Sequence, residues 1–159
     1  GDTAVFGIVQ GSTYPELRAE SARRTVEIGF DGYAVGGVSV GEAKSLLYDM
    51  VEASTAELPI ERPRYVMGVG SPEDLVECVA RGADVLLSEA SWTHDPPNRP
   101  PGIHLSGTEA GQLARESGVR ELLLTHIPPW TSREEVIAEA KAEFDGPIHA
   151  VSPGETFDF

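Results

Sequence analysis

The strongest constraint on the fold is a regular alternation of short apolar runs with longer stretches that carry apolar residues every three or four positions. Short apolar runs are typical of buried strands, and the three-to-four spacing is typical of helices. The alternation recurs about six times, which predicts an α/β fold: a largely parallel sheet of about six to seven strands, flanked by helices and joined by right-handed crossovers. The predicted strands cover residues 4–9, 30–35, 65–69, 85–88, 121–125 and 148–151, with 155–159 as a short last strand.

Helix starts are marked by a hydroxyl side chain followed by acidic residues in the first turn. The hydroxyl can accept a hydrogen bond from a free backbone N–H, and the acid interacts favourably with the positive end of the helix dipole. A glycine such as Gly82 or Gly118 marks the end of the helix. The four predicted starts are Thr13–Glu16, Ser71–Asp74, Ser106–Glu109 and Thr131–Glu134.

The chain has 159 residues, enough for one domain with its own core, and a formal net charge of −14. Nucleic acid is not an expected partner, because phosphate backbones are bound through Lys and Arg. The single cysteine, Cys78, cannot form an intrachain disulfide, and its apolar neighbours favour a core position. No apolar run is long enough for a membrane span and no signal peptide is visible, which predicts a cytoplasmic location.

Three motifs in the first half resemble those of tRNA-guanine transglycosylases. They read FGIVQGS, FDGYAVGGVSVGE and RYVMGVG, at Phe6–Ser12, Phe30–Glu42 and Arg64–Gly70. The resemblance covers roughly residues 3–82. It implies that this segment corresponds to the fifth to seventh strands of that family's TIM barrel.

The same resemblance implies a base pocket. Gln10 would bind the amide edge of a guanine or 7-deazaguanine base, Gly37 would offer a backbone N–H and Val38 a carbonyl oxygen. Met67 would cover the face of the base, and Glu42 would support the pocket from behind. These residues are therefore the candidate base-binding site.

The sequence departs from the transglycosylase pattern at the groups that carry the chemistry. The family's earlier strands, with their catalytic and base-reading aspartates, are not in the chain. The nucleophilic aspartate aligns with Leu87, and leucine cannot attack a ribose carbon. The family's Cys and His zinc site cannot be built from one cysteine. We therefore do not expect transglycosylation.

Three motifs in the second half resemble the C-terminal part of metallo-β-lactamase-fold hydrolases of the ribonuclease Z and phosphodiesterase kind. This resemblance covers roughly residues 75–159. It implies that His126 is a metal ligand and that His104 and Glu89 form a pair that assists proton transfer to the leaving group. The motifs are at Gly82–Trp92, His104–Gly111 and Leu122–Pro129.

The family's main metal motif, His-x-His-x-Asp-His, is absent from the sequence. A catalytic zinc site needs about three protein ligands and a water, and Glu89, His104 and His126 supply three donors in principle. Zinc is therefore the cofactor that these three residues could hold. The main expectation is that the chain binds no cofactor. The alternative for His126 is a strand-end histidine with a local hydrogen bond. His94 and Asp95 belong to a proline-rich loop, and His149 is expected to be structural.

The two resemblances overlap at Leu75–Asp84, where both families share a helix, a glycine stop and a strand. We interpret the chain as a chimera, more consistent with engineering than with natural fusion. Segments 1–82 and 83–159 would form a single α/β domain without a complete active site, and the open sheet edge would favour a homodimer or a domain-swapped assembly. No enzyme activity is the main expectation. The alternatives are a residual guanine-binding module and a weak zinc-dependent phosphodiester hydrolase.

Overall fold

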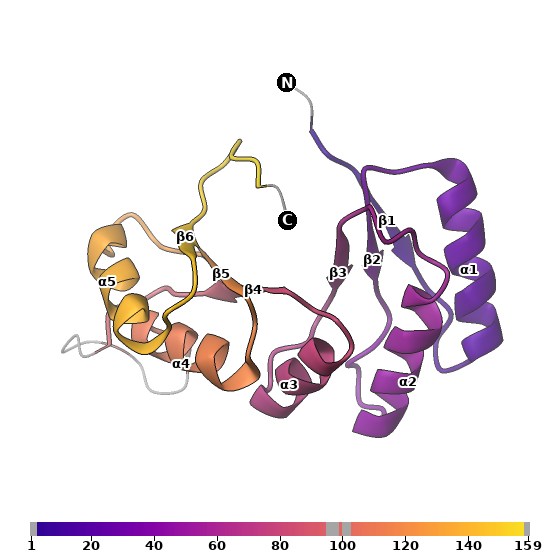
Figure 1. Ribbon diagram of the computed structural model, residues 1–159, viewed down its shortest axis with the longest axis horizontal. Coiled ribbons are helices and arrows are strands. Elements are labelled where there is room, and N and C mark those ends of the chain that lie inside the picture. The colour runs from indigo at the N-terminus through magenta and orange to yellow at the C-terminus, as the bar shows by residue number, and fades with distance from the viewer. Residues whose placement is uncertain (1–2, 95–98, 100–102, 158–159) are drawn as a thin grey trace. The chain divides into compact units, whose positions relative to one another are not determined.

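The computed structural model describes residues 3–94, 99 and 103–157 (Figure 1). Strands and helices alternate along this chain, and contacts divide it into two compact units, Gly1–Asp74 and Leu75–Asp158. The division falls within α3. The elements in order are β1 (Phe6–Val9), α1 (Pro15–Ile28), β2 (Gly32–Val35), α2 (Lys44–Thr55), β3 (Arg64–Val66), α3 (Pro72–Ala80), β4 (Val85–Glu89), α4 (Gly107–Ser117), β5 (Glu121–Thr125), α5 (Arg133–Glu143) and β6 (Ile148–Ala150).

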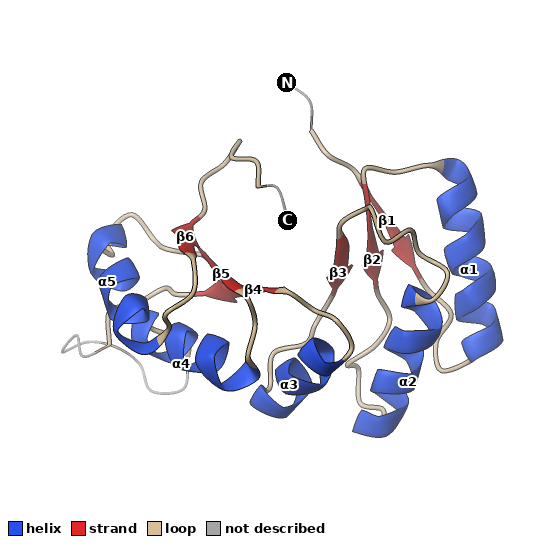
Figure 2. Cartoon of the chain, viewed as in Figure 1, coloured by secondary structure: helices blue, strands red, loops and turns tan. Residues whose placement is uncertain are grey.

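The first unit contains a parallel sheet in the order β1-β2-β3, with α1 and α2 on one face (Figure 2). Burial alternates along β1, as expected for a strand with one face covered by helices, whereas all four residues of the central strand β2 are buried. Val9, Val35 and the α2 residues Leu47 and Met50 form the centre of the core, each at most 2% exposed. Phe6 and Ile8 belong to the other face of β1 and are 39% and 49% exposed.

The second unit contains a parallel sheet in the order β4-β5-β6. Helices α4 and α5 pack against each other through a seam of small residues. A Cβ on Gly107 would overlap the carbonyl oxygen of Val136, and a Cβ on Gly111 would lie 2.6 Å from that of Ala140. Ala110 and Ala114 are fully buried beside the two glycines. The two backbones can approach this closely only because neither glycine has a side chain.

The predicted α/β class and the parallel strands are confirmed, but the strands form two sheets of three rather than one sheet of six or seven. The alternation along the chain predicts parallel crossovers; it does not determine which strands share a sheet. Of the predicted last strand, residues 155–157 form no strand, and residues 158–159 lie outside the described residues.

Two of the four predicted helix starts are confirmed. Ser106 and Glu109 form a complete capping box, and Ser71 Oγ accepts from the Asp74 N–H. The other two are wrong by one residue. Helix α1 begins at Pro15 after Tyr14 with no side-chain cap, because proline occupies the first turn. Ser132, rather than Thr131, caps α5.

Among the helices of the described residues, none is long and apolar enough to cross a membrane.

Candidate functional sites

The residues predicted to bind a base follow three neighbouring strands. Gln10 follows β1, Gly36 and Gly37 follow β2, and Met67 follows β3. Since these strands are parallel and adjacent, their carboxyl ends meet at one edge of the first sheet, where ligands of α/β proteins commonly bind. The first unit therefore brings the predicted base-binding residues to one edge.

The Gln10 side chain lies directly against the Gly36–Gly37 backbone. A Cβ on Gly36 would lie 2.8 Å from Gln10 Nε2, and a Cβ on Gly37 would overlap Gln10 Oε1. Gly37 has a φ of +62°, a conformation that favours glycine. Within the described part of the chain, the Gly37 N–H and the Gln10 side-chain amide make no hydrogen bond. Three polar groups at this edge are thus available to a ligand.

The remaining predicted residues surround this edge. Val38 is buried, and its carbonyl oxygen lies 3.8 Å from the place of a Cβ on Gly68, so the loops after β2 and β3 are neighbours. Met67 is 37% exposed. Glu42 accepts hydrogen bonds from the Ser39 and Val40 N–H groups. Backbone hydrogen bonds hold the pKa of Glu42 below its ordinary value, against the effect of burial. Glu42 therefore holds the loop after β2 as an ionised carboxylate.

Arg18 was not predicted and is fully buried, although it carries a charge. Its Nε donates to the Ser12 carbonyl oxygen at 2.6 Å, and its Nη1 and Nη2 donate to the carbonyl oxygens of Gly36 at 3.0 Å and Gly37 at 2.8 Å. Burial lowers the pKa of Arg18, while the charge of Glu42 raises it. Arg18 is four residues before the buried Ala22 and so shares its helix face, but the burial of that face is a property of the fold and not a signal in the sequence.

A second candidate site lies in the second unit. Glu89 ends β4 and is paired in register with Thr125, so Glu89 and His126 are neighbours at the carboxyl edge of that sheet. Glu89 Oε2 lies 2.5 Å from His104 Nδ1 and 3.3 Å from His126 Nδ1. The two imidazole rings meet edge to face with centroids 4.8 Å apart. The three predicted residues therefore form one cluster.

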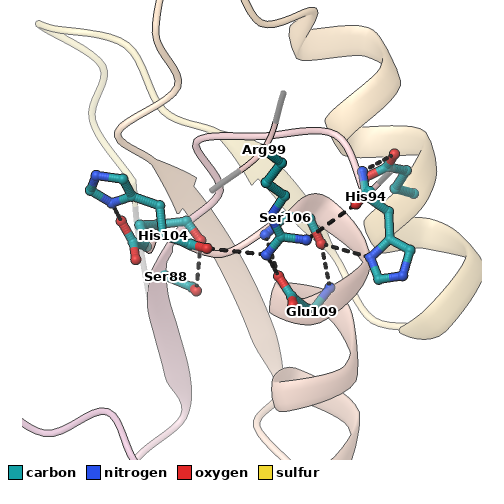
Figure 3. A network of polar contacts seen from close by, with 8 residues as sticks. Ser88, His94, Arg99, His104, Ser106 and Glu109 are labelled. Atoms are coloured by element: carbon teal, nitrogen blue, oxygen red, sulfur yellow. Dashed lines mark hydrogen bonds and ion pairs between the residues drawn. The ribbon is translucent and has the colours of Figure 1, made fainter. Parts of the chain in front are cut away.

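The backbone at both histidines is in the left-handed region, with φ of +62° at His104 and +53° at His126. This conformation is uncommon outside glycine and is usually held by surrounding contacts. Ser91 Oγ donates to the His126 carbonyl oxygen at 2.8 Å, and Arg99 Nη2 donates to that of His104 at 3.1 Å. Figure 3 shows the Arg99 guanidinium between the His104 backbone and the Glu109 carboxylate. Side chains of the second unit thus fix both histidines.

The cluster has the donors of a zinc site. Burial raises the pKa of Glu89, but hydrogen bonds from His104 and His126 outweigh it and hold the pKa below its ordinary value. The ligand atoms of the three residues lie within 4.8 Å of one another. Tetrahedral bonds of about 2.1 Å separate ligand atoms by roughly 3.4 Å. The Glu89–His126 pair, at 3.3 Å, is close to this separation. The Glu89–His104 pair is at hydrogen-bond distance, so zinc would require a small shift of this half-exposed pair.

The other predicted candidates lie outside the two candidate sites. Figure 3 shows the His94 ring beside Ser106, and its Nδ1 is 3.2 Å from the buried Ser106 Oγ. His149 Nε2 is 3.5 Å from Glu121. Leu87, at the position aligned with the transglycosylase nucleophile, is 50% exposed on β4. Asp95 lies outside the described residues. Neither His94 nor His149 belongs to the Glu89 cluster.

Comparisons with known proteins find relatives that are much longer than the matched segment. Uncharacterized protein ML1173 of Mycobacterium leprae is 71% identical over 94 residues, which are 59% of this chain and 32% of that protein. Uncharacterized protein Rv1339 of Mycobacterium tuberculosis is 67% identical over 94 residues, 59% of this chain and 34% of that protein. Queuine tRNA-ribosyltransferase of Thermoanaerobacter pseudethanolicus is 57% identical over 83 residues, 52% of this chain and 22% of that protein. The chain spans about a third or less of the length of these relatives.

The family described as TGT: Queuine tRNA-ribosyltransferase matches residues 1–93. This match confirms the predicted resemblance of residues 3–82 to transglycosylases. The resemblance of residues 75–159 to metallo-β-lactamase-fold hydrolases stays a prediction. Because the family match covers more than half of its 159 residues, the chain belongs to the queuine tRNA-ribosyltransferase family.

Proposed function

We propose that the first unit binds a guanine-type base, guanine or a 7-deazaguanine, at the edge formed by Gln10, Gly37 and Met67. The observation that carries the proposal is the contact between the Gln10 side-chain amide and the Gly36–Gly37 backbone. Membership of a family whose name refers to queuine and tRNA supports a base as the ligand.

The polar groups at this edge complement the edge of guanine. The base offers an N–H donor next to a carbonyl acceptor, and a glutamine amide offers one acceptor and two donors. The Gly37 N–H is a further donor, and the half-exposed Met67 side chain is suited to cover the ring face. The net charge of −14 disfavours a polynucleotide, so we propose the free base as the ligand.

Calorimetric titration with 7-deazaguanine tests this proposal. We expect Gln10→Ala to weaken binding about tenfold, since truncation removes hydrogen bonds from a preformed site. Gln112→Ala is the matched control, because the other glutamine of the chain is in α4 of the second unit. Equal affinities in Gln10→Ala and the wild type would contradict the proposal.

The Glu89–His104–His126 cluster favours a second candidate, a weak zinc-dependent phosphodiester hydrolase. When bound, zinc would supply a Lewis acid and an activated water. Glu89, His104 and His126 would hold it, and the strained histidine backbones are already fixed by Ser91 and Arg99. Elemental analysis tests the site: we expect about one zinc per chain in the wild type and in His149→Ala, and none in His126→Ala. Equal zinc in the two variants would contradict it.

We further propose that the chain is a chimera of a transglycosylase segment and a metallo-β-lactamase-type segment, joined near Leu75–Asp84. The division between the compact units, after Asp74, supports a junction here. Limited proteolysis followed by mass spectrometry tests this idea. Two stable fragments with ends near residues 75–84 are expected, whereas a resistant core that includes this segment would contradict two joined pieces.

A further inference from the structure

The full burial of Arg18 calls for a physical reason, because arginine is almost never fully buried unless its charge is paired. Among the ion pairs of the described residues, none includes Arg18, and its strong contacts are the backbone carbonyl oxygens of Ser12, Gly36 and Gly37. Its remaining contact, to Ser54 Oγ, is long at 3.5 Å. The guanidinium therefore connects the loop after β1 with the loop after β2.

The geometry of the peptide bond links this contact to the candidate base site. The Gly36 carbonyl and the Gly37 N–H belong to one planar trans peptide, so they point in opposite directions. Arg18 Nη1 holds the carbonyl at 3.0 Å, which directs the Gly37 N–H away from the guanidinium. The next peptide is held in the same way, because Nη2 binds the Gly37 carbonyl at 2.8 Å. Charged donors also polarise the peptides that they bind, which strengthens the opposite N–H as a donor.

We propose that Arg18 is a positioning residue: by holding the Gly36 and Gly37 carbonyl oxygens, it aims the Gly37 N–H at the 6-oxygen of a guanine-type base. This inference rests on the proposed base-binding function. It accounts for the buried charge, and it agrees with a glycine at position 37, where φ is +62° and a Cβ would overlap the present position of Gln10 Oε1. Lysine cannot replace Arg18, because a single ammonium group lacks the planar fork that reaches both carbonyl groups.

The test compares two bases in the full chain by calorimetry at 10 °C, after circular dichroism has established folding. Guanine carries the 6-oxygen and an N1–H group, and 2-aminopurine has the same ring and 2-amino group without either. We expect the wild type to prefer guanine about tenfold and Arg18→Lys to lose much of that preference, with its 2-aminopurine affinity changed less than about twofold. The part that remains is the contact of Gln10 with the amide edge of the base. Ser54→Ala is the control and should keep the preference, because the hydrogen bonds of the Ser54 hydroxyl go to Arg18 and to the Met50 carbonyl oxygen, and not to Gly36 or Gly37.

If the role of Arg18 were merely structural, Arg18→Lys would weaken the binding of both bases equally. An unchanged guanine preference in folded Arg18→Lys would therefore overturn the inference. A wild type that binds neither base would instead contradict the proposed function. In that case the orientation of the Gly37 N–H still tests the inference, and its residual dipolar coupling measures this orientation. A change in Arg18→Lys but not in Ser54→Ala supports it, and an unchanged coupling overturns it.

Discussion

Asp74 is a buried acidic residue of the first unit. It is 2% exposed, forms an ion pair with Lys44, and accepts a hydrogen bond from Tyr48 Oη at 2.7 Å. These contacts connect the first turn of α3 to α2. We expect Asp74→Asn to lower the free energy of unfolding by about 1–3 kcal/mol, because it weakens charge-assisted bonds in a buried place. Urea denaturation at pH 7 measures the loss, and the exposed Asp49→Asn on α2 should change stability by less than about 0.5 kcal/mol.

The same carboxylate predicts a pH dependence. Burial raises the pKa of Asp74, but hydrogen bonds from Lys44, Tyr48 and Ser71 outweigh it and hold the pKa below the ordinary value. A lowered pKa in the folded state stabilises the protein above the unfolded pKa of about 4, and this contribution is lost as the pH falls further. The stability difference between wild type and Asp74→Asn should therefore shrink between about pH 4 and pH 2. A difference that grows in this range would contradict the assignment.

In the sequence, the roles of the site residues come from family motifs. Gln10 and Gly37 could be proposed because the motifs were present, and their distance along the chain gave no sign that they touch. Arg18 was missed because a charged residue in an amphipathic helix is normally assigned to the exposed face. Its partners are carbonyl oxygens, which every residue has, so the sequence contains no complementary side chain that would reveal the contact.

At the scale of elements, the α4–α5 seam depends on two glycines one turn apart. A Cβ at residue 111 would lie 2.6 Å from the Ala140 carbonyl oxygen, and no side-chain rotation can relieve a clash with backbone. We expect Gly111→Ala to destabilise the protein by about 1–3 kcal/mol, despite the better helix propensity of alanine. Thermal unfolding of Gly111→Ala and Gly70→Ala gives the comparison, since nothing lies within 4 Å of a Cβ at Gly70. Equal melting temperatures would show that the helices adjust freely.

The sequence predicts which segments are helices and which are strands, but it does not predict which strands share a sheet. The six main strands were found because apolar periodicity is a local signal. Pairing of β4 with β5 rather than with β3 depends on long-range packing, which periodicity does not encode. Helix starts were predicted where the cap and its acid are both unambiguous, as at Ser106. The predicted start was one residue off where two adjacent side chains could each serve as the cap, as with Thr131 and Ser132 before α5.

At the scale of the whole molecule, 26 acidic residues face 12 basic ones, so repulsion between like charges opposes folding. Salt screens this repulsion. We expect the melting temperature at pH 7 to rise when sodium chloride is raised from 20 mM to 300 mM. The increase should be much smaller near pH 4.5, the isoelectric point of the sequence, where the net charge is close to zero. A decrease at pH 7 would mean that attractive ion pairs dominate the electrostatics.

Both tryptophans of the chain belong to the second unit. Trp92 is partly buried in a parallel bridge to Ser106, and Trp130 is 75% exposed. The first unit has tyrosines, among them the buried Tyr33, and no tryptophan. Excitation at the red edge of the absorption band selects tryptophan, so this fluorescence reports on the second unit alone. The tyrosine signals in the near ultraviolet come from the first unit. The sequence thus carries an optical label that would separate a response of the first unit to a base from a response of the second unit to zinc, without any added dye.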